Sequence, residues 1–349
     1  MTRNRIVINA GLARCGTTAT ETFFRSMPGF ATPQGVKELK FFLKHDSPDD
    51  YLRHFTSAPG DILFESSPPY MQNGLETFET VLARLAKFRA AGFDMHLLVH
   101  ARNLVKRAFS HYWHDINSHY AIYGKLWKVN DTADPRRFKS LYRKSFEAEL
   151  ANPERDDKFL PDLGQMLHRA CDVLGADKVR LVHTQTLDAG LTAFLRELTG
   201  QPDHDPVVTP RVTGAAAPLY LYGGAIGASI PLTDPTGAAF TADIPGGVSL
   251  LFARRHQELL HWKDYDLEQI RMAGESWTRS LQTSVLDARV QTYLDDQKAR
   301  LQGLPDVCFV ADQKDAMIQE LVTMPAALQI RPLQPEAAVV HKLLGRVPG

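Results

Sequence analysis

The segment from Gly11 to Thr18 is the first whose residue types suggest a chemistry. It reads Gly-Leu-Ala-Arg-Cys-Gly-Thr-Thr, follows a short β-branched run and precedes apolar residues at helical spacing. A strand, loop and helix in this order offer free backbone N–H groups and the positive end of a helix dipole to an anion. Compared with GxxxxGK[ST], the loop has both glycines and the final threonine, but Thr17 replaces the lysine that reaches the terminal phosphates. The loop therefore predicts a phosphate site unlike that of an ordinary ATP or GTP hydrolase.

A structural interpretation explains the same loop. The glycines then serve a tight turn alone, and Thr17 or Thr18 caps the following helix. Cys15 invites a reactive-thiol interpretation because a helix N-terminus lowers the pKa of a thiol, although a small buried residue is the simpler expectation. The cation of the loop is Arg14, two residues before Gly16.

A second polar group follows the predicted strand Met95 to Ala101. Arg102 stands at the strand end, and Ser110 comes eight residues later in a helix expected from Val105 to His114. Open α/β sheets bind ligands at the carboxyl ends of their strands. Arginine supplies a charge-assisted fork there and serine a neutral hydroxyl donor.

A third group combines two short segments. Lys-Glu-Leu-Lys-Phe-Phe runs from Lys37 to Phe42, and Phe-Glu-Ser-Ser-Pro-Pro-Tyr runs from Phe64 to Tyr70. A charged surface loop is the alternative for the first segment. Glu38 is the carboxylate of that segment and the candidate for proton transfer.

The three groups together resemble sulfotransferases that use 3′-phosphoadenosine 5′-phosphosulfate (PAPS), in particular the polysaccharide sulfotransferases and their bacterial relatives. The resemblance covers the first third of the chain clearly and implies a P-loop-like fold. One departure is Ser66, where some polysaccharide-modifying members carry lysine. The resemblance implies one general base and two sets of donor contacts: Glu38 as the base, Arg14, Cys15, Gly16, Thr17 and Thr18 at the 5′-phosphosulfate, and Arg102 and Ser110 at the 3′-phosphate.

The implied reaction transfers a sulfuryl group from PAPS to a hydroxyl or amine, with a saccharide as one candidate acceptor. Arg14 would neutralise charge on the leaving group rather than donate a proton, because a guanidinium does not deprotonate in proteins. No metal is expected, since no His, Cys or carboxylate spacing suits one. A histidine remains an alternative base, the candidates being His100, His111 and His114. Arg107 is expected in a solvated or structural ion pair.

Two other functions stay open. A P-loop kinase-like phosphotransferase would need Mg²⁺ and ATP, and Thr17 argues against it. A non-catalytic binding protein that keeps the fold is suggested by the unfamiliar residues 213–349. The sequence leaves the acceptor and the oligomeric state undecided.

The elements that must position these residues alternate between strand and helix. Strands are predicted at residues 6–10, 61–64, 95–101 and 179–183, and helices at 17–24, 75–91, 105–114, 163–174 and 191–198. This alternation predicts an α/β fold with a parallel central sheet flanked by helices. We expect a donor-binding domain over residues 1–212 and a mainly helical C-terminal extension over 213–349. In that extension, 213–248 is expected as a long loop and 250–301 as helix.

Composition narrows the class of partner. Lys plus Arg and Asp plus Glu are both 40, so the global charge gives no reason to expect nucleic acid or a membrane surface. No segment has the roughly 18 apolar residues of a membrane span. Three cysteines, Cys15, Cys171 and Cys308, fit neither a disulfide framework nor a CxxC metal site, which favours a cytoplasmic, reducing location.

Overall fold

The computed structural model describes most of residues 5–328 and separates the chain into two compact units. Unit 1 comprises residues 1–111, 149–213 and 286–325, and unit 2 comprises 112–148, 214–285 and 326–349. The expected boundary after residue 212 lies beside the end of the second segment of unit 1, whereas 286–325 pack with the N-terminal residues. The described residues are 5–58, 60–111, 150–203, 205, 207–208, 220–223, 228–233, 239–244, 249–253, 258–262, 281–282, 288–310 and 313–328.

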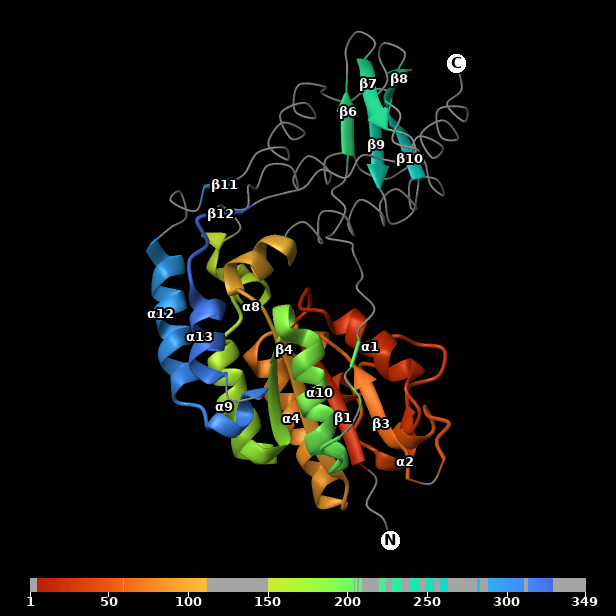
Figure 1. Cartoon of the computed structure of the whole chain (residues 1–349), viewed down its shortest axis with the longest axis vertical. Coiled ribbons are helices and arrows are strands. Elements are labelled where there is room, and N and C mark those ends of the chain that lie inside the picture. The colour runs from red at the N-terminus through yellow and green to blue at the C-terminus, as the bar shows by residue number, and fades with distance from the viewer. Residues whose placement is uncertain are drawn as a thin grey trace. The chain divides into compact units, whose positions relative to one another are not determined.

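Unit 1 is built on a five-stranded parallel sheet with the order β2-β3-β1-β4-β5 (Figure 1). The chain leaves β1 toward β3 and later leaves β4 toward β5, so the direction of the connections reverses between the neighbours β1 and β4. Such a reversal is where open α/β sheets bind ligands. The strands are β1 (Arg5–Gly11), β2 (Phe30–Ala31), β3 (Ile62–Ser66), β4 (Asp94–Ala101) and β5 (Val179–His183).

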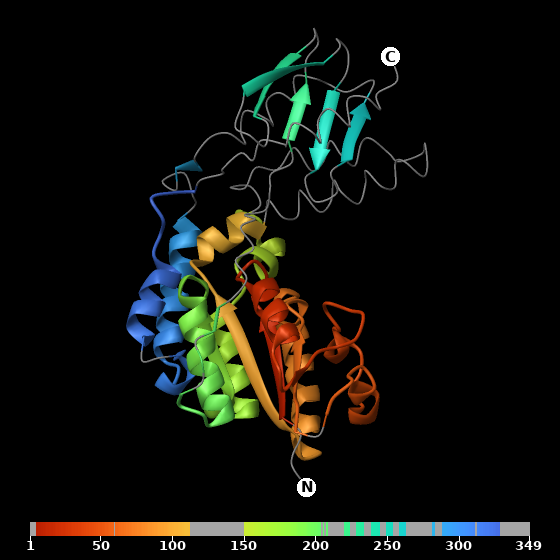
Figure 2. The same cartoon turned by 45° about the vertical axis from the view of Figure 1, so that its right-hand side comes forward.

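Helices cover both faces of this sheet. Helices α1 and α10 pack on one face, and α4 and α9 pack on the other, where α12 and α13 add a further layer beside α9 (Figures 1 and 2). The helices of unit 1 are α1 (Thr17–Ser26), α2 (Pro48–Leu52), α3 (Pro69–Gln72), α4 (Leu75–Ala90), a helical stretch at 104–111, α8 (Asp156–Phe159), α9 (Leu163–Leu174), α10 (Leu187–Thr199), α12 (Ala288–Gln302) and α13 (Lys314–Val322).

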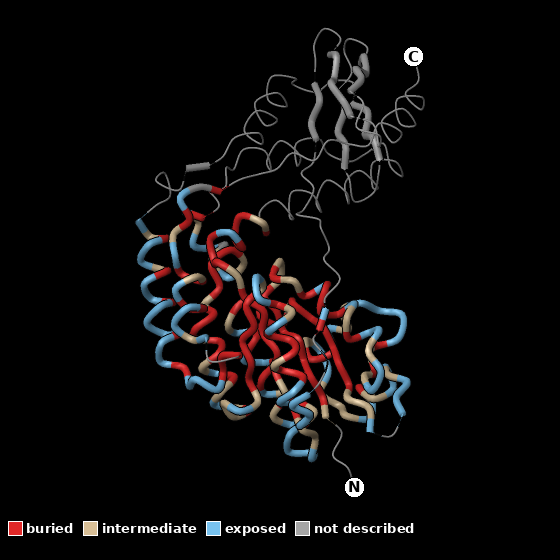
Figure 3. Tube along the Cα trace, in the orientation of Figure 1, coloured by how far each residue is buried: buried red, intermediate tan, exposed pale blue. Residues whose placement is uncertain are grey.

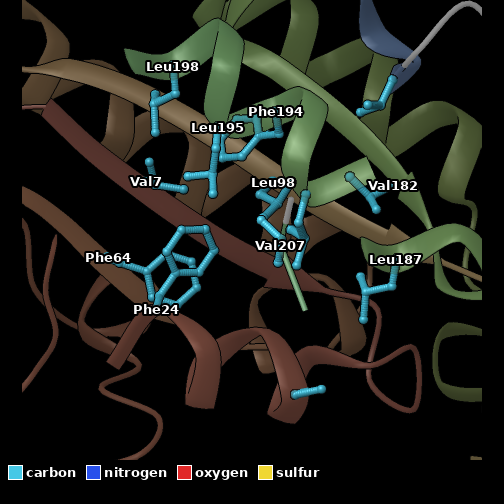
Figure 4. Close-up of a cluster of buried hydrophobic side chains, with 13 residues drawn as sticks. Val7, Phe24, Phe64, Leu98, Val182, Leu187, Phe194, Leu195, Leu198 and Val207 are labelled. Carbon is cyan, nitrogen blue, oxygen red and sulfur yellow. The ribbon is translucent and has the colours of Figure 1, made fainter. Parts of the chain in front are cut away.

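The sheet is buried on both faces, which explains why its strands are continuous apolar runs rather than alternating ones (Figure 3). On the α1 and α10 face, the rings of Phe24 and Phe64 stack with centroids 4.1 Å apart beside Val7 and Leu98 (Figure 4). Full burial of one such side chain stabilises the fold by about 1.5–3 kcal/mol. Helix α10 approaches closely because Gly190 has no side chain: a Cβ there would lie 2.6 Å from Val182.

Local signals set the ends of several helices. Asp162 caps α9 by accepting a hydrogen bond from the backbone N–H of Gln165 at 3.0 Å, and Gly175, with φ 94°, follows the last residue of that helix. Ser47 caps α2 in the same way by accepting from Asp50. Helix α1 is different, since its N-cap is Gly16 and no side chain caps it.

The sequence predictions of strands and helices in unit 1 are confirmed, with shifts of one or two residues at most ends and a start four residues earlier for α10. For the helix expected at 105–114 this holds to residue 111, and residues 112–114 lie outside the described residues. The helical C-terminal part is confirmed by α12 and α13, which begin only at residue 288.

Two predictions need correction: the loop expected over 213–248 contains strands, and the helix expected over 250–301 is confirmed only from residue 288. The expected loop contains β6 (Tyr220–Gly223), β7 (Ala228–Thr233) and β8 (Ala239–Ile244), and the expected helix contains β9 (Ser249–Ala253) and β10 (Glu258–Trp262). Strand β9 pairs antiparallel with both β6 and β10, and β7 pairs with β8. Runs of two or three apolar residues fit either period, so pairing with another strand decides the structure.

The remaining short elements of the described residues are the strand pair β11 (Leu281–Gln282) and β12 (Ala327–Leu328) and the 3₁₀ turns η1 (Phe41–Leu43), η2 (Pro153–Arg155), η3 (Ala176–Lys178), η4 (Thr184–Thr186) and η7 (Asp306–Cys308). Turn η7 brings Cys308 to the side of α9, where its Sγ lies 3.4 Å from that of Cys171. Both are free thiols. Cys171 and Cys308 therefore lie side by side, although 137 positions separate them in the sequence.

Candidate active site

The loop after β1, residues 11–18 (the β1 loop), lies against the end of β4. The backbone N–H of Leu12 donates to the carbonyl of His100 at 2.7 Å. The hydroxyl of Thr184, directly after β5, lies 2.9 Å from the carbonyl oxygens of both Cys15 and Ala101. The loop is therefore fixed at the point where the sheet connections reverse, next to Arg102.

The β1 loop has an unusual backbone. Arg14 has φ 71° and Gly16 has φ 87°. A non-glycine residue in this left-handed region costs on the order of 1–3 kcal/mol and persists where its surroundings enforce it, often at functional sites. Across the described residues, Arg14 and Lys40 are the non-glycine residues with positive φ. Both are cations in segments that the sequence singled out for chemistry.

The N-terminus of α1 is open to an anion. Gly16 is the N-cap residue and has no side chain, so no N-cap side chain accepts from the first N–H groups of the helix. No acidic residue lies in the first turn. The structural interpretation, in which Thr17 or Thr18 caps the helix, is therefore not what the structure shows. Uncapped N–H groups and the helix dipole favour a negatively charged ligand at this end.

Arg14 and Ser110 meet, although they come from two different sequence groups. Nε of Arg14 donates to Oγ of Ser110 at 3.3 Å, across 96 residues of sequence, and both side chains remain partly exposed. The helical stretch 104–111 brings Ser110 to this position, and the Asn103 side chain caps it by accepting from the N–H of Lys106 at 3.0 Å. The two predicted phosphate-binding groups thus form one cluster.

Cys15 and Arg102 also belong to this cluster. Burial raises the pKa of the Cys15 thiol, and the nearby charges of Arg107, Arg102 and Arg14 oppose that rise. Cys15 is fully buried, as the simpler sequence interpretation expected, and is a neutral thiol rather than a reactive thiolate. Arg102 is only half-buried, so its guanidinium can reach a ligand from solvent.

Sequence reasoning missed one cation of the site. Nζ of Lys37 donates to Oγ1 of Thr18 at 2.8 Å, which places an exposed ammonium at the start of α1. Thr17 itself is buried. No spacing rule predicts this contact, because Lys37 lies 19 residues after Thr18 and reaches it only through the fold.

Glu38 lies in the segment from Lys37 to Phe42 (the Glu38 loop). Its carboxylate pairs with Nζ of Lys40 at 3.2 Å, and 31% of its side chain is exposed. The loop is tied to α1 at one end, since Lys37 contacts Thr18 and Nη2 of Arg25 donates to the carbonyl of Val36 at 3.2 Å. Glu38 is thus an accessible carboxylate beside the β1 loop.

The other basic candidates have different positions. His111 is buried, and its Nδ1 lies 3.3 Å from Nη2 of Arg107, a group that can only donate. Arg107 is fully buried and donates to the carbonyls of Lys158 and Phe159, so it is not solvated and has a structural role. His100 is fully buried, and burial lowers its pKa to about 3.

His114 lies outside the described residues. Within the part of the chain that the structure describes, no group of three His, Cys, Asp or Glu side chains is arranged to hold a metal ion. In that same part, no helix has the length and apolar character needed to cross a membrane.

Comparison with protein-family models gives no match, and neither does comparison with curated proteins. Among solved structures, the crystal structure of a sulfotransferase from Alicyclobacillus acidocaldarius is similar over 57% of this chain and 80% of that chain. The sequence identity is 20% and the TM-score is 0.38. At this TM-score, the similarity is not evidence for function, and the residues of the site are the only evidence for it.

Proposed function

We propose that this protein is a sulfotransferase that uses PAPS as its sulfuryl donor. The observation that carries the proposal is the contact between Arg14 and Ser110, which joins the two sequence groups that resemble the donor-binding motifs. The two residues are 96 positions apart in sequence and meet because their segments follow the neighbouring strands β1 and β4, at the reversal of the sheet connections. A donor with phosphates at both its 5′ and 3′ positions needs such a joint site.

The β1 loop would hold the 5′-phosphosulfate. The uncapped N–H groups at the start of α1 and the guanidinium of Arg14 would bind the negative charge of the phosphosulfate. Lys37 adds a positive charge at Thr18. Arg102 and Ser110 would hold the 3′-phosphate, the first by a charged fork and the second by a neutral hydroxyl.

The proposed reaction is an in-line displacement at sulfur. An acceptor oxygen or nitrogen forms a bond to the sulfur atom, while the bond from sulfur to the bridging oxygen of the 5′-phosphate breaks. The electron pair of that bond stays on the phosphate, and 3′,5′-diphosphoadenosine leaves. Arg14 and Lys37 would stabilise the charge that develops on the leaving group, which is the main task of an enzyme in such transfers.

Glu38 would accept the proton that leaves the acceptor. A partly exposed carboxylate beside the β1 loop is suited to act as a general base on a bound hydroxyl or amine. His111 is a poorer candidate, because its Nδ1 accepts from Arg107 and its Nε2 lies 3.0 Å from the Gln72 amide. Burial keeps His100 from solvent.

The residues present require no metal for this chemistry, and we propose none. A kinase-like phosphotransferase would place a lysine where Thr17 is buried. The acceptor is proposed only as a hydroxyl or amine compound, with saccharides as the first class to test.

Incubation with labelled PAPS and a panel of saccharide, phenol and amine acceptors tests the proposal. We expect formation of 3′,5′-diphosphoadenosine together with a labelled product, and no transfer from labelled ATP in the presence of Mg²⁺. Transfer from ATP but not from PAPS would instead support the phosphotransferase.

A further inference from the structure

A fully buried carboxylate stands behind the Glu38 loop. Glu65 is the fourth residue of β3 and has no exposed surface. Its Oε1 accepts a hydrogen bond from the Ser67 hydroxyl at 2.6 Å and a short one from the Tyr70 hydroxyl. Ser67 is fully buried as well, and Tyr70 belongs to α3. A buried carboxylate is costly unless it does something that an apolar residue cannot do.

The two hydroxyls connect Glu65 to the backbone of the Glu38 loop. Oγ of Ser67 accepts from the N–H of Lys40 at 2.9 Å, and the Tyr70 hydroxyl accepts from the N–H of Phe42 at 3.0 Å. Turn η1 begins here, and no side chain of Lys40 caps it. The hydroxyls therefore bind N–H groups at the start of a turn that has no cap of its own.

The carboxylate decides which way both hydroxyls point. A hydroxyl has one proton and two lone pairs. An ionised carboxylate only accepts, so Ser67 and Tyr70 must each direct the proton toward Glu65 and a lone pair toward the loop. Burial raises the pKa of Glu65, and hydrogen bonds from Ser67 and Tyr70 oppose that rise. An apolar residue at position 65 would give neither hydroxyl an acceptor, so each hydroxyl could turn and present its proton, rather than a lone pair, to the backbone N–H.

We propose that Glu65 is a positioning residue, which holds Glu38 in place through Ser67 and Tyr70. This proposal rests on the proposed function of Glu38. The anchored N–H of Lys40 is two residues after Glu38 in the same loop. Lys40 has φ 55°, a conformation that a lysine keeps only where its neighbours enforce it. The far side of η1 is held by Arg84, which donates to the carbonyl of Phe42 at 2.7 Å.

Two adjacent buried serines offer a matched pair for the test. Ser67 links Glu65 to the N–H of Lys40, whereas Ser66 accepts only from the side-chain amide of Asn9, at 3.1 Å. Ser67→Ala removes a contact to the loop, and Ser66→Ala removes a buried hydrogen bond of the same strand end that does not touch the loop. Both variants lose one buried hydroxyl oxygen, and unfolding of each in denaturant measures any general loss of stability separately from the exchange of the loop amides.

Hydrogen exchange of the loop amides tests the anchoring without any knowledge of the reaction. We expect exchange at Lys40 to rise at least tenfold in Ser67→Ala, exchange at Phe42 to rise similarly in Tyr70→Phe, and both to rise in Glu65→Leu, which removes the acceptor of both hydroxyls. Ser66→Ala should leave both amides within about twofold of the wild type. Equal exchange in Ser66→Ala and Ser67→Ala would overturn the proposal.

Kinetics then separate positioning from donor binding. For Ser67→Ala and Tyr70→Phe, we expect kcat with PAPS to fall at least tenfold, while affinity for 3′,5′-diphosphoadenosine stays within twofold. Adding either change to Glu38→Gln should cause little further loss, because the base that the network positions is then absent. If the fold-losses in kcat of the two single variants instead multiply in the double variant, the network does not act through Glu38 and the proposed role of Glu65 is wrong. A wild-type protein that binds no 3′,5′-diphosphoadenosine would refute the sulfotransferase proposal, while the exchange results would still judge the anchoring.

Discussion

The β1 loop, residues 11–18, is held at the carboxyl ends of strands β4 and β5, whereas the Glu38 loop is held by the hydroxyls of a buried side-chain network. Leu12 bonds to β4 through main-chain atoms, and Thr184 fixes the Cys15 carbonyl. The backbone N–H groups of Lys40 and Phe42 instead donate to the hydroxyls of Ser67 and Tyr70. The first loop is therefore defined by a short motif and the sheet, and the second by a buried network.

This difference separates two tasks. A loop that binds phosphate uses backbone N–H groups, so its shape matters more than its side chains. A loop that carries a general base must place one carboxylate against an acceptor, and placement within a fraction of an ångström affects the rate strongly. Substitutions in the two loops should accordingly change different measurable quantities.

The largest effect is expected from Glu38→Gln. The amide is nearly isosteric with the carboxylate but cannot take up a proton at neutral pH, so kcat should fall about 10²–10⁴-fold. Donor affinity should stay close to that of the wild type, because the β1 loop is unchanged. Single-turnover rates and titration with 3′,5′-diphosphoadenosine measure the two quantities. Wild-type turnover with chemistry shown to be rate-limiting would exclude Glu38 as the base.

The contrast between the loops also explains how much the sequence could predict. Parallel strands, their covering helices and the β1 loop follow from local periodicity, glycines and a short motif, and the structure has all of them. Lys37 at Thr18 and Glu65 beneath the Glu38 loop depend on contacts 19 to 28 residues apart, for which the sequence has no periodic signal. Strands β6 to β10 were missed because their short apolar runs fit several structures until a partner strand is known.

The free energy of unfolding should fall in acid because of His100, which lies beside the β1 loop. His100, whose carbonyl binds the N–H of Leu12, is fully buried, and its pKa is lowered from 6.5 to about 3. A lowered native pKa means that the unfolded chain takes up this proton first, so stability is complete above pH 6.5 and is lost as pH falls toward 3. Between pH 7 and pH 4.5 the loss from this group is about 2–3 kcal/mol.

Denaturant unfolding at both pH values measures that loss. His100→Leu should lose about 2–3 kcal/mol less than the wild type over this interval, since a leucine has no proton to take up. The exposed His54 provides the control, and His54→Gln should behave as the wild type does. An identical acid-dependent loss in His100→Leu would show that the His100 ring is not the group responsible.

Donor affinity should depend unequally on the two residues assigned to the 3′-phosphate. Arg102→Ala removes a charged contact, worth about 1.5–3 kcal/mol, whereas Ser110→Ala removes a neutral one, worth nearer 1 kcal/mol. Calorimetric titration with 3′,5′-diphosphoadenosine should therefore show a larger loss for Arg102→Ala. The opposite order would tell against the assignment of these two residues.

The smallest effect concerns the backbone of the β1 loop. Gly16 and Gly200 both have positive φ, but a Cβ at Gly16 would lie 3.2 Å from Leu187, whereas nothing lies within 4 Å at Gly200. Each change to alanine should destabilise the fold by about 1–2 kcal/mol through the left-handed backbone. Gly16→Ala should in addition weaken donor binding, measured by titration, and Gly200→Ala should not. Weaker binding in both variants would mean that global stability, rather than loop shape, sets donor affinity.

Titration of the wild-type protein with 3′,5′-diphosphoadenosine and with ADP tests the central claim most directly. The two nucleotides share adenosine and a negatively charged 5′ end, but only the first has a 3′-phosphate to bind Arg102 and Ser110. Charged hydrogen bonds of about 1.5–3 kcal/mol predict a Kd for 3′,5′-diphosphoadenosine at least tenfold lower than that for ADP. Equal affinities, or tighter binding of ADP, would contradict the assignment of this protein to PAPS-dependent sulfuryl transfer.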